Sequence, residues 1–178
     1  AADEALGQRV RVGDDHRGGE LGDGGGEARP LKPDAPALER DADPVAILAD
    51  SIRAVELHRA TFERTRQAVM DHLKGYGLRA AQATALASVW LINGDFLLID
   101  LPGRFHFVVG NPPYVRQELI PDALMAEYRA RYATIYDRAD LYIPFIERSL
   151  TQLEDAGHLG FICADRWMKN RYGGPLRK

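Results

Sequence analysis

Hydrophobic residues recur along the chain in two patterns, which predict short strands alternating with amphipathic helices. Short apolar runs predict strands in SIRAVEL, RFHFVVG and HLGFICA, and a strand edge with a turn in LINGDFLL. Apolar residues three or four positions apart predict helices in HRATFERTRQAVMDHLKGYG, LRAAQATALASVW, PDALMAEYRARYA and LYIPFIERSLTQLEDAG. This alternation indicates an α/β fold whose parallel sheet carries helices on both faces.

Two helix starts carry residues suited to capping. Asp43 can cap a helix whose first position is Pro44, a favourable place for proline. Asp140 can cap the helix LYIPFIERSLTQLEDAG, in which Pro144 falls in the tolerant first turn. The apolar positions 141, 145, 146, 150 and 153 share one face, so we expect this helix to continue through Leu153.

The amino-terminal segment has a different composition from the remainder. Eight of the 17 glycines lie in the first 30 residues, and the first aromatic residue of the Phe, Trp or Tyr type is Phe62. Such a segment can bury little apolar surface, so we expect the Gly/Pro-rich residues 1–42 to be low in complexity and disordered. An ordered domain is expected over residues 43–178.

Charge and cysteine content exclude several classes of protein. The net charge of −3 argues against a chain that binds nucleic acid over its whole surface, although local contacts are compatible with it. The single cysteine, Cys163, excludes an internal disulfide and a multi-cysteine metal site, and its apolar surroundings predict a core residue. The sequence shows neither an apolar signal segment nor a run long enough to cross a bilayer, so we expect a cytoplasmic protein without a metal or membrane partner.

Carboxylates follow two of the predicted strands, where a parallel α/β sheet forms its ligand crevice. Glu56 ends the strand SIRAVEL and can accept hydrogen bonds from both hydroxyls of a ribose, or it is an ordinary surface glutamate. Asp95 can accept a hydrogen bond from an exocyclic amine such as that of adenine, while Phe96 packs on a ring face. The alternative for Asp95 is an ordinary Asn-Gly-Asp turn.

Two consecutive prolines, flanked by Asn111 and Tyr114, follow the strand RFHFVVG. Pro112 and Pro113 fix their own φ angles and bias the preceding residue to extended geometry. The side-chain carbonyl of Asn111 and the backbone carbonyl of Pro112 are therefore expected to form two fixed acceptors for an amino group that bears two hydrogens. Tyr114 offers a flat ring for stacking on a planar base. The alternative is a proline-stiffened loop without a ligand.

The order of these segments resembles that of the N6-adenine DNA methyltransferases of restriction-modification systems. It is most similar to the γ-class type II enzymes, in which methylase and endonuclease are often one polypeptide. GNPPYVRQE looks like the catalytic motif of that family, and NGDFLLIDLPGRFHFVVGNPPY matches its spacing from the cofactor-adenine motif. RADLYIPFIERSL and GHLGFICADRWMKNRYGGPLR resemble the elements that follow, so the resemblance covers about residues 52–178.

The resemblance implies a partial Rossmann-like methyltransferase catalytic domain over residues 43–178, with S-adenosyl-L-methionine as cofactor and double-stranded DNA as partner. By the same resemblance, Glu56 would hold the ribose hydroxyls of the cofactor, whereas Asp95 and Phe96 would bind its adenine. A fused or associated endonuclease and a specificity domain are further expected partners.

The catalytic motif of the resembled family carries over to the proline loop. Asn111 and Pro112 would accept hydrogen bonds from the amine of the target adenine, and Pro113 would shape the loop. Tyr114 would stack on the flipped base. Downstream, Arg116 and Gln117 are candidates for contacts with the DNA backbone or with the space that the flipped base leaves, or else solvated residues at a helix start.

The chain departs from the family pattern on both sides of the matched segment. The first motif of the family, an acidic residue with Pro and a Gly-x-Gly turn, is replaced by RVRVGDDHRGGELGDGGGEARP before Glu56. We therefore hypothesise that residues 1–42 are a foreign or out-of-frame amino terminus joined to a methylase body, which the surrounding reading frame would test. The target-recognition domain that follows GGPLRK in the family is absent, so we expect little activity from this chain alone.

Three functions are compatible with these motifs. The first is a site-specific, adenine-specific DNA methyltransferase, favoured by the YVRQE extension and the DLYIPFIERSL segment. The second is a methyltransferase of RNA base amines or protein glutamine amides, which uses the same Asn-Pro-Pro-Tyr site. The third is an inactive truncated remnant of a methylase.

Overall fold

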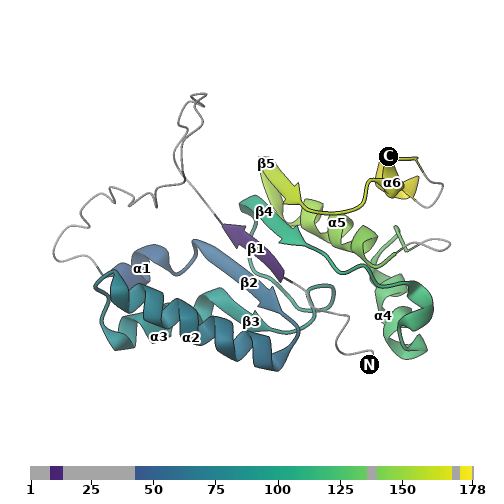
Figure 1. The fold of residues 1–178 in the computed structure, drawn as a ribbon. Helices are drawn as coiled ribbons and strands as arrows, with labels where there is room; N and C mark the ends of the chain where they lie inside the picture. The colour runs from purple at the N-terminus through teal and green to yellow at the C-terminus, as the bar shows by residue number, and fades with distance from the viewer. Residues whose placement is uncertain (1–8, 14–42, 136–139, 170–172, 178) are drawn as a thin grey trace, which may run out of the picture.

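Five strands form one mixed sheet in the computed structural model, which describes residues 9–13, 43–135, 140–169 and 173–177 (Figure 1). In the spatial order β3-β2-β1-β4-β5, the strands are β1 (Arg9–Gly13), β2 (Ile52–Glu56), β3 (Leu91–Asn93), β4 (Phe105–Asn111) and β5 (Leu153–Phe161). β2 is parallel to β3 and β4 is parallel to β5, whereas β1 is antiparallel to both β2 and β4. All strands except β1 therefore run in the same direction.

β1 is the exception to the predicted parallel sheet. It lies between β2 and β4, with Val10 opposite Val55 on one side and Gly110 on the other (Figure 1). A strand in this position supplies backbone partners to the facing edges of β2 and β4, which would otherwise be left unpaired inside the sheet. The prediction of disorder over residues 1–42 did not include this strand, and the other residues of that segment lie outside the described residues.

The predicted helices are present with small changes at their ends. They are α1 (Pro44–Leu48), α2 (Arg59–Gly75), α3 (Ala80–Trp90), α4 (Asp122–Arg131) and α5 (Tyr142–Thr151), whereas the short α6 (Arg166–Lys169) was not predicted. The cap predicted for α1 is confirmed, because Asp43 Oδ1 accepts a hydrogen bond of 3.1 Å from the Val45 N–H and Pro44 takes the first helical position.

The predictions for the start and end of α5 are wrong. Its N-cap is Leu141 and makes no side-chain cap, so Asp140 does not play the predicted role. The helix ends at Thr151, because the chain turns there and Leu153 already pairs with Phe105 of β4. Backbone pairing with a neighbouring strand therefore outweighs the helical periodicity of the sequence.

Apolar side chains pack on both faces of the sheet, as the sequence predicted. On one face, α2 and α3 cover β2 and β3 through a cluster that includes Trp90, Leu91 and Ala54. On the other face, Val55 and Val108 pack with residues of α4 and α5 (Figure 1). Adjacent residues of β2 thus serve opposite layers, as the two-residue period of a strand requires. Across the ranges described, we find no helix with both the length and the apolar character needed to span a membrane.

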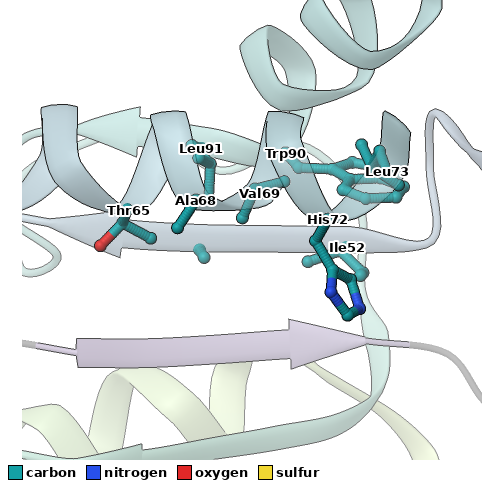
Figure 2. Close-up of a pocket in the computed structure, with 9 residues that line it drawn as sticks. Ile52, Thr65, Ala68, Val69, His72, Leu73, Trp90 and Leu91 are labelled. Atoms are coloured by element: carbon teal, nitrogen blue, oxygen red, sulfur yellow. The ribbon is translucent and has the colours of Figure 1, made fainter. Parts of the chain in front are cut away.

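A cavity of about 590 Å³ opens between α2 and the sheet (Figure 2). Its walls are largely apolar and are formed by Ile52, Ala54, Thr65, Ala68, Val69, His72, Leu73, Trp90 and Leu91. Ile52 begins β2, whereas the predicted site residue Glu56 ends it. The cavity therefore lies away from the edge of the sheet that carries the predicted chemistry.

Candidate active site

The carboxyl ends of β2, β3, β4 and β5 lie along one edge of the sheet, because these strands share one direction. Glu56 closes β2, Asn93 closes β3 and Asn111 closes β4. The predicted grouping of polar strand-end residues at one edge is confirmed by this topology. Figure 1 shows β1 running against its neighbours, so its first residue, not its last, reaches this edge.

Glu56 lies in a nearly buried position at the end of β2. Glu56 is only 8% exposed, and its Oε1 accepts a hydrogen bond of 3.0 Å from the His58 N–H. The side-chain amide of Asn93 donates to the backbone carbonyls of Glu56, at 2.8 Å, and Leu57, at 3.0 Å. Asn93 thus ties the ends of β2 and β3 together, a role that the sequence did not indicate.

Asp95 follows β3 and is held through both of its carboxylate oxygens. Oδ1 accepts a hydrogen bond of 2.8 Å from the Leu97 N–H, and Oδ2 accepts one from the hydroxyl of Tyr128 on α4. Burial raises the pKa of Tyr128, and the hydrogen bond to Asp95 raises it further. Tyr128 therefore remains a protonated donor at neutral pH. The two residues are 33 positions apart, so no local sequence signal indicated this pair.

Phe96 lies in the core rather than at the surface of the site. It is fully buried, its ring centroid is 5.2 Å from that of Phe145, and the Arg148 guanidinium carbon lies 5.2 Å above its ring. The packing of the Phe96 ring on a ligand stays a prediction, because in this structure other side chains cover the ring.

Arg148 fixes the turn that follows Asp95. Its guanidinium donates to the carbonyl of Leu97 at 3.5 Å, to the carbonyl of Ile99, and to the hydroxyl of Tyr132 at 3.0 Å. Tyr132 in turn donates to the Leu97 carbonyl at 2.6 Å. Arg148 of α5 thereby satisfies the backbone carbonyls of Leu97 and Ile99 in the turn, which stabilises the position of Asp95.

The proline loop begins at the last residue of β4. Asn111 is exposed, whereas Pro112 and Pro113 are both buried. Tyr114 is exposed again, and the next residue, Val115, returns to the core at 5% exposure. The two prolines are therefore anchored inside, while the amide and the ring that flank them reach solvent at the carboxyl edge of the sheet.

The Tyr114 ring is supported from two sides. Its centroid lies 5.6 Å from that of the fully buried Tyr142, with an interplanar angle of 44°. Its hydroxyl donates to the carbonyl of Ile162, just after β5, at 3.4 Å. Because 55% of Tyr114 nevertheless remains exposed, it presents a held aromatic surface beside the end of β4.

Arg116 and Gln117 follow this surface. Arg116 is exposed and precedes a short 3₁₀ helix, Gln117–Leu119. The Gln117 Oε1 accepts a hydrogen bond of 3.1 Å from Arg129 of α4, an exposed cation that the sequence analysis did not single out. Arg116 and Gln117, which we call the loop extension, and α4 together place polar and cationic groups next to the proline loop.

Most of the sequence matches a known family of proteins. The model of the family described as Eco57I restriction-modification methylase matches residues 51–178. The chain is 71% identical over 130 residues to Type II methyltransferase M.PaeR7I of Pseudomonas aeruginosa, a match that covers 73% of this chain and 23% of the relative. It is 58% identical over 130 residues to Type II methyltransferase M.XhoI of Xanthomonas vasicola, which covers 73% of this chain and 24% of the relative.

A more distant relative carries a more specific name. The chain is 39% identical over 82 residues to the adenine-specific methyltransferase PglX of Streptomyces coelicolor, covering 42% of this chain and 7% of the relative. The chain spans less than a quarter of the length of the relatives that it resembles most strongly in these comparisons. The family match, in contrast, covers most of the chain and includes every strand-end residue described above, from Glu56 to Tyr114. The chain therefore belongs to the Eco57I restriction-modification methylase family.

Proposed function

We propose that this chain provides the target-base side and the adenosine side of the active site of an adenine-specific DNA methyltransferase that uses S-adenosyl-L-methionine. The observation that carries the proposal is the arrangement at the carboxyl edge of the sheet. There, the exposed Asn111 and Tyr114 flank two buried prolines, on the same edge as Glu56. The adenine-specific function of the relative PglX supports the choice of substrate.

The residues at the ends of β2 and β3 fit the adenosine part of the cofactor. Glu56 is a carboxylate at a strand end and can accept hydrogen bonds from ribose hydroxyls. Asp95, held in place by Leu97 and Tyr128, keeps acceptor capacity for an exocyclic amine, because each carboxylate oxygen can accept two hydrogen bonds. Phe96, the neighbour of Asp95 in the sequence, would bind the same adenine, as the resemblance implies.

When bound, S-adenosyl-L-methionine supplies an electrophilic methyl group on a sulfonium. The contribution of this chain is to position the nucleophile. Asn111 and the carbonyl of Pro112 would accept hydrogen bonds from the two N–H groups of the target amine. These bonds orient the lone pair of the amine for in-line attack. Pro113 would fix the shape of the loop. No side chain has to form a covalent bond with the substrate.

Tyr114 would stack on an adenine that has been flipped out of the DNA duplex. Its ring is already held by Tyr142 and by the carbonyl of Ile162, so little motion is needed to form the stacking surface. Arg116, Gln117 and Arg129 would contact the DNA backbone or the space left by the flipped base. Such contacts would account for local DNA binding by a chain whose net charge is negative.

Calorimetric titration with S-adenosyl-L-methionine, followed by transfer of a radiolabelled methyl group, tests the proposal. We expect binding to the 178-residue chain and only weak label on adenine in double-stranded DNA, which is lost in Asn111→Ala. RNA and a protein carrying an exposed glutamine would be assayed in parallel, and label on either alone would show that the substrate class is wrong. An absence of heat at millimolar cofactor would instead favour an inactive remnant.

A further inference from the structure

We infer that Tyr128 is a positioning residue that orients the carboxylate of Asp95 toward the exocyclic amine of the cofactor adenine. This inference rests on the proposed function. Tyr128 is 1% exposed and reaches from α4 to Oδ2 of Asp95, while the Leu97 N–H holds Oδ1 at 2.8 Å. Because a different donor holds each oxygen, the plane of the carboxylate is fixed as well as its position.

The neighbouring Tyr132 shows that a buried tyrosine here does not need a carboxylate partner. It is 7% exposed, lies one helical turn after Tyr128, and satisfies its hydroxyl with the backbone carbonyl of Leu97 at 2.6 Å. Tyr128 instead engages an ionisable side chain at the ligand edge of the sheet. Burial of an aromatic ring is sufficient to explain why Tyr132 is present. It does not explain why the hydroxyl of Tyr128 bonds to a carboxylate rather than to a backbone carbonyl.

The helix that carries Tyr128 also contacts the loop beside the target base. Arg129, the next residue of α4, donates to Gln117 at 3.1 Å, and Gln117 follows the proline loop closely in sequence. α4 therefore holds Asp95 on one side and the loop extension on the other. The orientation of Asp95 is consequently tied to the same rigid element that supports the proline loop.

The electrostatic state of the pair suits this role. Burial and the adjacent carboxylate both raise the pKa of Tyr128, so the proton stays on the tyrosine across the neutral range. Tyr128 then donates a hydrogen bond to Asp95 and keeps its own proton. The remaining lone pairs of the carboxylate can accept from an amine, but they gain nothing from a carbonyl at the same place on the base.

The test compares two ligands that differ at this position of the adenine and at the adjacent N1, which carries a hydrogen in the oxygen analogue. Tyr128→Phe in the full chain would be titrated with S-adenosylhomocysteine and with the analogue in which oxygen replaces the N6 amine. We expect Tyr128→Phe to bind the amine ligand about tenfold more weakly, which is the loss in affinity expected when one charge-assisted hydrogen bond is no longer held in position. Binding of the oxygen analogue should be unchanged. Replacing Tyr128 by para-aminophenylalanine, which retains a donor, should restore the preference.

Tyr132→Phe is the matched control, because it also removes a buried tyrosine hydroxyl, with its hydrogen bonds to Leu97 and Arg148, but no direct hydrogen bond to Asp95. It should lower the thermal unfolding midpoint without changing the preference between the two ligands. An equal loss of affinity for both ligands in Tyr128→Phe, or the same amine-specific loss in Tyr132→Phe, would overturn the inference. Failure of the unchanged chain to bind either ligand would instead defeat the proposed function and the inference with it.

A double-variant cycle supplies a second measurement. In Asp95→Ala the acceptor oxygens are gone, so adding Tyr128→Phe should cause no further change in the preference for the amine ligand. If the two substitutions act additively on that preference, Tyr128 works through something other than Asp95 and the inference fails.

Discussion

The ring of Tyr114 rests against that of Tyr142, with centroids 5.6 Å apart and planes inclined at 44°. Tyr142 is fully buried and Tyr114 is 55% exposed, so the pair links the core to an aromatic surface at the end of β4. A stacking surface held in this way loses little conformational freedom when a base binds to it.

Tyr114→Ala should therefore weaken the binding of a short single-stranded oligonucleotide that contains adenine. Stacking of one base on an aromatic side chain contributes about 1–3 kcal/mol, which corresponds to a loss of roughly tenfold or more in affinity. The fluorescence of 2-aminopurine placed at the adenine position reports the stacking directly. Tyr76→Ala is the control, because Tyr76 is 62% exposed but lies after α2, away from the proline loop. A similar loss in both variants would contradict specific stacking on Tyr114.

Glu56→Gln should weaken the binding of S-adenosyl-L-methionine about tenfold, since an amide offers a single acceptor oxygen to the two ribose hydroxyls. The backbone contact should survive, because the side-chain oxygen of glutamine can still accept the hydrogen bond from His58. Calorimetry would measure the affinity. Glu63→Gln removes a carboxylate that pairs with Arg59 and Arg66 on α2 and should leave cofactor affinity unchanged.

The strand-end residues could be predicted from sequence because their signals are local. Proline chemistry and a short, β-branched strand that ends in glycine and asparagine both lie within a few positions of Asn111. Helical crossovers join β2 to β3 through α2 and α3, and β4 to β5 through α4 and α5, so the strands of each pair are parallel and end at the same edge. That edge was predictable without knowing a single tertiary contact.

The supports of the site could not be predicted in this way. Tyr128 reaches Asp95 across 33 positions, and Arg148 reaches the carbonyls of Leu97 and Ile99 across 51 and 49. Nothing in the helical pattern around Tyr128 or Arg148 distinguishes a buried polar anchor from an ordinary helix residue. β1 was missed for a related reason, because a five-residue strand in a glycine-rich segment is selected by the gap between β2 and β4.

Arg148→Met should destabilise the chain by about 2–4 kcal/mol, because the Ile99 carbonyl loses its donor and the Leu97 carbonyl keeps only that of Tyr132. Methionine keeps much of the apolar contact with Phe96, so the loss reports mainly the hydrogen bonds. Urea unfolding followed by circular dichroism gives the free energy of unfolding. Arg64→Met, on the exposed side of α2, should change that free energy by less than about 0.5 kcal/mol. Equal effects in the two variants would refute the role assigned to Arg148.

Stability should fall in alkaline solution because of the tyrosines on and after α4. Burial raises the pKa of both Tyr128 and Tyr132 in the folded chain, whereas in the unfolded chain each titrates near its ordinary value of about 10. Above that pH the unfolded state binds fewer protons than the folded state, so the free energy of unfolding decreases as pH rises. Below about pH 9 the contribution of these hydroxyls is fully present and independent of pH.

Urea unfolding between pH 8 and pH 11 would measure this slope in the unchanged chain, Tyr128→Phe and Tyr132→Phe, with the pH window set by the ordinary tyrosine pKa of about 10. Each phenylalanine variant should be less stable at pH 8, because a buried hydrogen bond is lost, but should lose less stability than the unchanged chain on going to pH 11. The flattening should be larger for Tyr128→Phe, since Asp95 adds to the effect of burial there while Arg148 opposes it at Tyr132. Parallel curves for all three proteins would show that neither hydroxyl titrates differently in the folded and unfolded states.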